Sequence, residues 1–203
     1  MGKPPRIILG LGNPGARYAD TRHNVGFRVV EELAGRRRIE LDRQECNALV
    51  GWDERLALAA PQTFMNRSGY SARCFMERWE LEPDGFLVVY DEVHLPLGGL
   101  RLRPGGSPGG HRGMESVVEN LGSDRVPRLR LGISGGHGPA DGEGLVDFVL
   151  EPFAADELEV VEEMIRRAAD ACELWAREGA EAAMQRFNRR RPTATESETK
   201  SGG

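Results

Sequence analysis

Five polar residues in this sequence have side chains suited to chemistry, and each stands after an apolar run or in a loop: Asn13, His23, Asn66, Asp91 and His111. A lone histidine is more often a capping or surface residue than a catalyst. Here, however, several polar groups occupy corresponding ends of elements, which is where the ligand sites of open α/β sheets lie. We therefore predict that these residues share one cleft, with His23 as the candidate for acid–base chemistry.

The glycines of the first bend, Gly10, Gly12 and Gly15, match the G-x-G-x-x-G spacing of a dinucleotide-binding turn. In that turn an apolar-patterned helix begins at the glycines, whereas residues 16–24 are polar and unpatterned. The acidic residue that binds the ribose would also fall inside a predicted helix. We therefore disfavour a nicotinamide-dependent oxidoreductase, and we interpret the glycines as permitting a tight bend with positive φ angles.

Metal ligation and a serine nucleophile are disfavoured by the spacing of the residues they need. The candidate metal ligands are Asp91, Glu92, His94 and His111. Their spacing matches no H-x-x-x-H or H-E-x-x-H pattern, so neither a metal nor a cofactor is expected. The sequence has no G-x-S-x-G, and the glycine-rich loop before His111 lacks the Lys-Ser/Thr ending of a P-loop. An activated water is the nucleophile that remains.

The three cysteines, Cys46, Cys74 and Cys172, are odd in number and include no C-x-x-C pair. We therefore expect neither a disulfide framework nor a zinc site, and a reducing cytoplasm as the compartment. Cys74 and Cys172 fall on the apolar faces of predicted helices, which indicates a packing role. No apolar run is long enough for a signal peptide or a membrane span, so no membrane partner is expected.

The chain carries a net charge of −5, which argues against indiscriminate nucleic-acid binding. Only Lys3 and Lys200 are lysines, so nearly all basic residues are arginines. We favour a GC-rich genome as the explanation of this bias, although the planar guanidinium also suits bidentate phosphate contacts. We predict that Arg101, Arg103 and Arg130 form a positive surface beside the cleft.

Periodicity predicts one α/β domain with a mixed, mostly parallel sheet and helices on both faces. The expected strands lie at residues 6–9, 86–90, 100–103 and 129–133, with a hairpin at 47–59. Three expected helices lie at residues 25–37, 156–177 and 180–190. A further helix is expected to begin at residue 68 with Tyr70 on its apolar face, and a separate short helix is expected to end at residue 121. Residues 1–190 are expected to form the folded domain, 191–203 a disordered tail, and 135–144 a flexible lid.

With these residues in view, the chain resembles the bacterial peptidyl-tRNA hydrolase family. The motifs are Gly10-Leu11-Gly12-Asn13-Pro14-Gly15, Tyr18, Thr21-Arg22-His23-Asn24-Val25-Gly26, Phe64-Met65-Asn66, Asp91, Leu95-Pro96 and Gly109-Gly110-His111. The likeness runs from about residue 6 to 188 with order and spacing kept. It implies a cytoplasmic, monomeric enzyme of translation and ribosome rescue, which uses neither metal nor cofactor. Its expected reaction is hydrolysis of the ester between a peptide and the 3′ ribose of tRNA.

The resemblance also implies roles for the cleft residues. His23 is then the general base on a water, and Asp91 fixes its tautomer and favours the imidazolium. Asn66 matches a substrate-binding amide that can donate to the developing oxyanion. Asn13 matches the position that separates peptidyl from aminoacyl substrates, since a free ammonium would have to lose water in the same site.

Further matched positions imply contacts to the acceptor end and phosphate backbone of peptidyl-tRNA. They are Tyr18, Phe64, Met65, Asn66, Arg103, His111, Arg112 and Arg130. Two positions depart from the family pattern, because Arg112 and Glu115 stand where an asparagine and a basic residue are usual. We expect this pair to interact at i, i+3 on one helix, and Arg112 to alter substrate binding rather than chemistry.

The main alternative is a non-catalytic RNA-binding relative with the same fold. Such a relative could keep a basic face while losing the residues that act on the ester. Asn13, His23, Asn66 and Asp91 are all present in this chain, which favours the enzyme.

Overall fold

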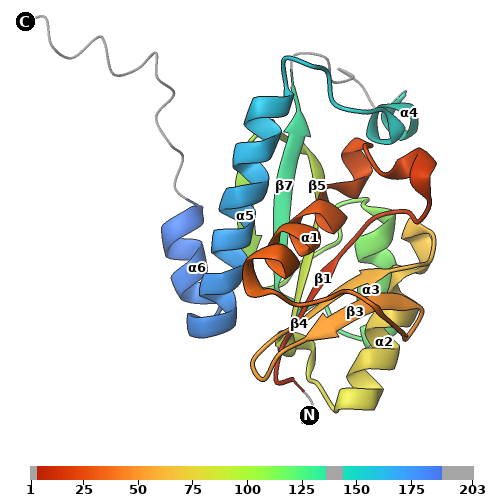
Figure 1. Ribbon diagram of the computed structural model, residues 1–203, viewed down its shortest axis with the longest axis vertical. Coiled ribbons are helices and arrows are strands. Elements are labelled where there is room, and N and C mark those ends of the chain that lie inside the picture. The colour runs from red at the N-terminus through yellow and green to blue at the C-terminus, as the bar shows by residue number, and fades with distance from the viewer. Residues whose placement is uncertain (1–3, 136–143, 189–203) are drawn as a thin grey trace, which may run out of the picture.

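A computed structural model describes residues 4–135 and 144–188 of the chain. One seven-stranded sheet with the order β2-β3-β4-β1-β5-β7-β6 forms its centre (Figure 1). The strands are β1 (Ile7–Gly10), β2 (Arg43–Glu45), β3 (Ala48–Trp52), β4 (Ala57–Pro61), β5 (Phe86–Pro96), β6 (Leu100–Arg103) and β7 (Arg128–Ser134). Strands β4, β1, β5 and β7 are parallel neighbours, whereas β3 and β6 run antiparallel to the strands beside them. The predicted single domain with a mixed, mostly parallel sheet is confirmed.

Helices cover both faces of the sheet, as predicted (Figure 1). One face packs against α1 (Val25–Arg37), α5 (Leu158–Glu178) and α6 (Ala180–Phe187). The other face packs against α2 (Ser68–Trp79) and α3 (Arg112–Leu121). The short helix α4 (Leu145–Leu150) lies at the end of the sheet where β7 finishes (Figure 1). None of the helices in these residues has an apolar stretch long enough to cross a membrane.

The central strands follow from the apolar runs of the sequence. In β1, Ile8 joins the core under α1 and α5, while Ile7 and Leu9 join the core under α2 and α3. Alternate residues of a strand point to opposite faces, so a strand covered on both sides must be apolar throughout. Strand β5 continues past the apolar run to Pro96, so Asp91 lies inside the strand, opposite Leu131, and not at its end as predicted.

Helix α2 differs from its prediction in the face that it buries. Ser68 is the first helical residue, and its hydroxyl donates to the Met65 carbonyl at 2.9 Å, so it does not occupy the expected cap position. Ala72, Phe75 and Trp79 are buried, whereas Tyr70 is 57% exposed. The spacing of three and four residues from Ala72 turns Tyr70 away from the core, and the prediction for Tyr70 was wrong.

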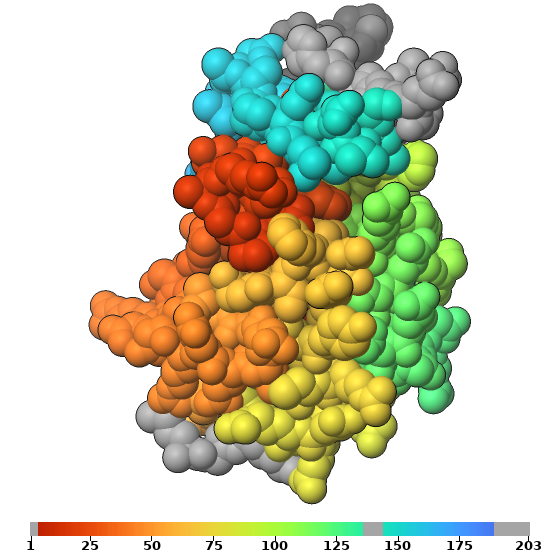
Figure 2. Space-filling view, turned by 90° about the vertical axis from the view of Figure 1, so that its right-hand side faces the viewer, coloured from red at the N-terminus to blue at the C-terminus, as the bar shows by residue number. Residues whose placement is uncertain are grey.

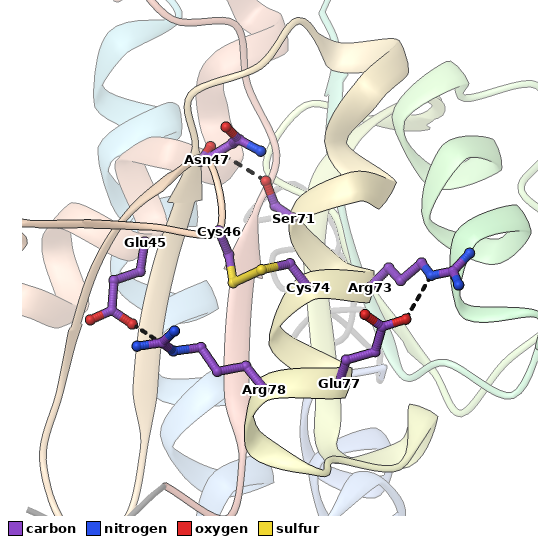
Figure 3. The surroundings of a disulfide bond; sticks show 8 residues. All are labelled: Glu45, Cys46, Asn47, Ser71, Arg73, Cys74, Glu77 and Arg78. Atoms are coloured by element: carbon purple, nitrogen blue, oxygen red, sulfur yellow. Dashed lines mark hydrogen bonds and ion pairs between the residues drawn. A yellow bond between two sulfur atoms is a disulfide. The ribbon is translucent and has the colours of Figure 1, made fainter.

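The expectation that no disulfide forms is also wrong, because Cys46 and Cys74 are joined by one (Figure 3). Cys46 lies in the two-residue turn between β2 and β3, and Cys74 lies in the middle of α2. The sequence separates them by 28 residues, and only the packing of the turn against the helix brings their Cα atoms to 5.4 Å. Cys172 is free and buried, in agreement with its predicted packing role.

The remaining elements agree with the sequence in type and approximate bounds. The hairpin between β3 and β4 is confirmed, although the short edge strand β2 was missed. The predicted helix at 180–190 ends at Phe187. Most of the predicted lid, the predicted tail and the last residues of the predicted domain lie outside the described residues.

Candidate active site

His23 occupies a short 3₁₀ helix, Arg22–Asn24, immediately before α1. The bend after β1 is fastened to this helix by the Asn24 side chain. Its Oδ1 accepts from the Asn13 backbone N–H at 2.9 Å, and its Nδ2 donates to the Asn13 carbonyl at 3.0 Å. Both asparagines are buried. The residues between them therefore form a loop closed at its base, which places Asn13 and His23 side by side.

The glycines of the bend serve close packing more than unusual backbone angles. A Cβ on Gly10 would lie 2.2 Å from the Gly26 carbonyl oxygen, and one on Gly12 would lie 2.8 Å from the Phe27 ring. Of the three glycines in the bend, only Gly15 has a positive φ, at 103°. The interpretation of a tight bend holds, but at Gly10 and Gly12 the reason is contact with α1 and not positive φ.

Asp91 is the centre of a three-residue hydrogen-bond network. Its Oδ1 lies 2.7 Å from His23 Nδ1 and 3.0 Å from His111 Nε2, and the carboxyl is 2% exposed. Burial raises the pKa of Asp91, but the two imidazoles outweigh burial through their charge and hydrogen bonds and hold the pKa well below its usual range. The carboxylate therefore stays ionised between two N–H donors.

The tautomer of His111 follows from the helix that it caps. Its Nδ1 accepts the backbone N–H of Met114 at 3.1 Å, at the N-terminus of α3. Nδ1 must then be unprotonated, so Nε2 carries the hydrogen that Asp91 accepts. The same carboxylate takes the Nδ1 hydrogen of His23, which leaves His23 Nε2 as a free base.

Asn13 joins the first bend to the loop before α2. Its Oδ1 accepts from the Met65 backbone N–H at 2.8 Å, so its amide nitrogen is the end available to a ligand. Asn66, the next residue, is exposed and lines the same cleft. Two amide groups and one imidazole thus stand around a single opening.

The cleft has a volume of about 490 Å³. Among its lining residues are Asn13, His23, Phe64, Met65, Asn66, Asp91, His111 and Arg112, so the predicted convergence of the five polar residues is confirmed. Figure 2 shows the contributing regions of the chain bordering one another on one face: red for the first bend, gold for the loop before α2, green for the approach to α3 and teal for α4.

The apolar wall of the cleft was missed by the sequence reasoning. It comes from α4, through Leu145, Val146, Val149 and Leu150. Val146 is 60% exposed, and Phe64, another lining residue, is 57% exposed. An apolar helix of six residues beside a polar cleft was a signal in the sequence, but only the fold shows which surface it faces.

Three predicted site residues do not line the cleft: Tyr18, Arg103 and Arg130. The Arg17 guanidinium lies 4.4 Å from the centre of the Tyr18 ring. Arg103 is exposed on β6, and Arg130 on β7 is paired with Glu92. These residues are therefore candidates for contacts outside the cleft.

The predicted grouping of arginines on one face is confirmed by strand register. Arg130 lies directly opposite Arg101, and Arg103 follows two residues later on the same strand, so all three point to one side of the sheet. Arg128, on the same side, is buried and donates to the carbonyls of Val126, Ser107 and Asp124. The Glu92 carboxylate offsets the charge of Arg130, which reduces the positive surface that the sequence predicts.

The expected pairing of Arg112 with Glu115 is wrong for the part of the chain that the structure describes, where no ion pair joins them. Arg112 is exposed at the rim of the cleft, and Glu115 is held through its backbone N–H by the His111 carbonyl at 2.9 Å. The guanidinium is therefore free to meet a ligand at the cleft entrance.

His23, Asp91 and His111 also form a group with the composition of a metal site. Their ligand atoms lie within 4.8 Å of one another, although the sequence spacing matched no known motif. His111 Nδ1 already accepts the Met114 backbone N–H at the start of α3. The N–H groups at His23 Nδ1 and His111 Nε2 both donate to the same oxygen of Asp91. The contacts within the group are those of a hydrogen-bond network that orients His23.

Arg22, beside His23, anchors the 3₁₀ helix to the rest of the fold. Its buried guanidinium lies 2.7 Å from the Glu157 carboxylate and 3.3 Å from the Ile133 carbonyl. Its planar face stacks against Phe148 of α4 and against Phe153, at 4.4 and 4.6 Å from the ring centres. One side chain therefore connects the histidine, the end of β7 and the apolar wall.

Taken together, a buried aspartate, an oriented imidazole and amide donors at one edge of an α/β sheet define a site of the hydrolase type. Comparison with known proteins agrees with this class. The family model described as peptidyl-tRNA hydrolase matches residues 7–196. The chain therefore belongs to the peptidyl-tRNA hydrolase family, as the sequence motifs indicated.

Individual relatives match over nearly the whole chain. A peptidyl-tRNA hydrolase of Syntrophomonas wolfei is 43% identical over 187 residues, covering 90% of this chain and 100% of the relative. One of Salinibacter ruber is 44% identical over 192 residues, covering 93% and 100%. The crystal structure of the Acinetobacter baumannii peptidyl-tRNA hydrolase superposes with a TM-score of 0.85 at 32% identity, covering 95% of this chain and 99% of that one.

Proposed function

We propose that this protein hydrolyses the ester that joins a peptide to the 3′ ribose of tRNA, with a water activated by His23. The observation that carries the proposal is the Asp91 network. Asp91 accepts the Nδ1 hydrogen of His23 at 2.7 Å and thereby leaves Nε2 as the base in the cleft. The family membership of the chain supports the choice of substrate.

In the proposed reaction, His23 Nε2 removes a proton from water as the oxygen attacks the ester carbonyl carbon. The imidazolium that forms is stabilised by the Asp91 carboxylate, by the logic of the hydrolase triads. When the tetrahedral intermediate collapses, the imidazolium returns the proton to the 3′ oxygen of the ribose, and tRNA leaves. General-base catalysis of this type contributes about 10² to 10⁴ in rate.

The oxyanion of that intermediate needs a donor, and Asn66 is the proposed one because its amide lines the cleft. Loss of such a donor typically costs about 3 kcal/mol. The Asn13 amide nitrogen is proposed to donate to the carbonyl oxygen of the acyl group on the α-nitrogen, which only a peptidyl substrate carries. Its oxygen is engaged by Met65, so Asn13 offers no acceptor to the charged ammonium of an aminoacyl-tRNA.

The surroundings of the cleft divide between the two parts of the substrate. The apolar wall of α4 and the exposed Phe64 suit the peptide, since they provide apolar surface beside the polar centre. Arg112, Arg103 and Tyr18 are proposed to contact the acceptor end and phosphate backbone of the tRNA, with His111 and Met65 shaping the cleft. For Arg130, the ion pair with Glu92 must yield before the guanidinium can bind phosphate.

The same proposal places the reaction in the cytoplasm, where peptidyl-tRNA arises during translation. It also favours a monomer, because every residue assigned to the reaction comes from one chain. The assay that tests the function measures release of tRNA from an N-acetyl-aminoacyl-tRNA and, in parallel, from the free aminoacyl form. We expect kcat/KM to be at least a hundredfold higher for the N-acetyl substrate than for the free aminoacyl form, because only the N-acetyl substrate has a neutral α-nitrogen. Equal rates would contradict the role of Asn13, and no release from either substrate would contradict the function.

A further inference from the structure

The turn between β2 and β3 has an unusual residue at its first position. Cys46 and Asn47 both have left-handed backbone angles, with φ of 52° and 53°, as in the tight type of hairpin turn. Asparagine tolerates this region, whereas a cysteine adopts it at a conformational cost. The pairing of β2 with β3 on either side of the turn and the bond of Cys46 to Cys74 in α2 (Figure 3) both constrain this position.

The same turn braces the loop that carries part of the cleft. The Asn47 carbonyl accepts from the Gln62 backbone N–H at 2.6 Å, just before that loop, and from the Ser71 hydroxyl at 3.4 Å, just after it. The disulfide fixes this turn to α2 from one side (Figure 3). Both ends of the segment between Gln62 and Ser71 are thus tied to one small turn.

One hydrogen bond joins that segment to the cleft residue Asn13, and a second lies within the segment itself. The Met65 backbone N–H donates to Asn13 Oδ1 at 2.8 Å, and the Met65 carbonyl accepts from Ser68 at 2.9 Å. Asn66 lies between these anchors, and its position therefore depends on the backbone that the turn holds.

The surroundings of the disulfide suit exchange with thiols. Cys46 and Cys74 are both partly exposed, so an external thiolate can approach. Arg78, one helical turn after Cys74 on the same face, forms an ion pair with Glu45 at 3.1 Å beside the disulfide (Figure 3). The Glu45 carboxylate offsets the charge of this arginine, so the partial exposure of the two cysteines is the feature that opens the disulfide to exchange.

The third cysteine is unable to take part in this exchange. Cys172 is fully buried in the core under α1 and α5, and burial raises the pKa of its thiol. It therefore remains a thiol away from the surface, and any reaction of the disulfide must come from outside the protein.

We propose that the Cys46–Cys74 disulfide is a reversible redox-modification site whose reductant is a dithiol of the thioredoxin chemical class. One thiolate of the dithiol attacks Cys46 Sγ, the S–S bond breaks, and Cys74 leaves as a thiolate. The second thiolate of the dithiol then displaces Cys46, closing the dithiol's own disulfide, and the two protein thiolates take up protons from water. Two electrons pass from the dithiol to the protein.

The consequence lies in the cleft and rests on the proposed function. Reduction removes the covalent tie between the turn and α2 and leaves the weaker hydrogen bond from Ser71, so the segment from Gln62 to Ser71 gains freedom. Asn66 then spends less time in position for the substrate. A disulfide in a compartment that keeps thiols reduced is usually transient or redox-sensing, which agrees with a regulatory bond better than with a permanent one.

The experiment compares the oxidised and the reduced protein, prepared with the thiol oxidant diamide or with reduced dithiothreitol, each removed before the assay. Thiol titration after denaturation should count one thiol in the oxidised form and three in the reduced form, given three cysteines and one disulfide. We expect kcat/KM for N-acetyl-aminoacyl-tRNA to fall at least threefold on reduction and to recover on reoxidation. Three thiols in the oxidised preparation, or equal kcat/KM in both states, would overturn the proposal.

Two variants distinguish the effect of losing the disulfide from the effect of changing the turn residue. Cys46→Asn/Cys74→Ala removes the disulfide but keeps a residue that tolerates the left-handed turn, and it should show the reduced-state rate in both buffers. Cys172→Ala should respond to the buffers as the wild type does. A double variant that still responds to the buffers would overturn the proposal.

Amide hydrogen exchange gives a readout that does not depend on hydrolysis. Across residues 62–67 we expect exchange at least threefold faster in the reduced protein than in the oxidised protein. If neither form releases tRNA, the proposed function fails, while the exchange rates still decide the redox proposal. Equal exchange in the two forms overturns it.

Discussion

Asp91 is the residue on which the electrostatics of the site depend. It accepts one hydrogen from each of two imidazoles, and one of these, His111, is held in its tautomer by the N-terminus of α3. His111 was predicted to contact the substrate. In the structure its Nε2 hydrogen-bonds to Asp91, the carboxylate that orients His23. A buried carboxylate with two N–H donors keeps its charge where burial alone would remove it.

The lowered pKa of Asp91 predicts how stability depends on pH. The carboxyl ordinarily titrates near pH 3.9. Since its folded-state pKa is lower, its contribution to the free energy of unfolding is complete above about pH 4 and is lost as the pH falls towards the folded value. Asp91→Asn lacks this contribution at every pH. Urea denaturation should therefore show a larger deficit for Asp91→Asn at pH 5 than at pH 3, and the account fails for Asp91 if the deficit is the same at both.

At the scale of elements, the cleft is built where β1, β5, the loop before α2 and helix α4 come together. The pieces are joined by side chains that make no contact with a substrate in the proposed reaction. Asn24 fastens the first bend, and Arg22 joins the 3₁₀ helix of His23 to Phe148 in α4. The shape of the cleft is thus a property of these joints as much as of the lining residues.

Arg22→Lys tests the joint between the histidine and α4. Lysine keeps the charge near Glu157 but loses the planar face that stacks on Phe148 and Phe153. We expect the free energy of unfolding in urea to fall by about 1–3 kcal/mol, since a buried charge loses part of its partners.

Arg166→Lys is the matched control, because that arginine is half exposed and pairs with Glu163 on the helix surface. Its expected effect is below about 0.5 kcal/mol, in line with other surface pairs. A loss for Arg22→Lys no larger than that of the control would show that the stacked guanidinium does not hold the joint.

The type and order of the elements could be predicted from the sequence where local patterns decide them. Helix α1 and strand β6 have the predicted bounds, because apolar periodicity and nearby turns set both. The length of β5 could not be predicted, since the polar residues from Asp91 onward are paired by β7 and not by their own pattern. The apolar wall of α4 was missed because only the fold shows which surface that helix faces.

For the whole molecule, the meeting of the polar residues in one cleft was predictable from the sequence, and the disulfide was not. Asn13, His23, Asn66 and Asp91 belong to short motifs, and the parallel sheet brings the motifs to one cleft. The disulfide joins residues that no local pattern relates, one in a turn whose strand β2 was itself missed. The net charge of the sequence also could not predict the ion pair of Arg130 with Glu92, because this pair forms between neighbouring strands.

The central claim is that His23 activates the water while the rest of the cleft binds the substrate. The most direct test measures single-turnover release of tRNA from N-acetyl-aminoacyl-tRNA by the wild type and by His23→Ala, with binding of the uncleaved substrate measured in parallel. We predict that the variant releases tRNA at least a hundredfold more slowly and binds the substrate within about threefold of the wild type. Near-normal release by His23→Ala would contradict the account.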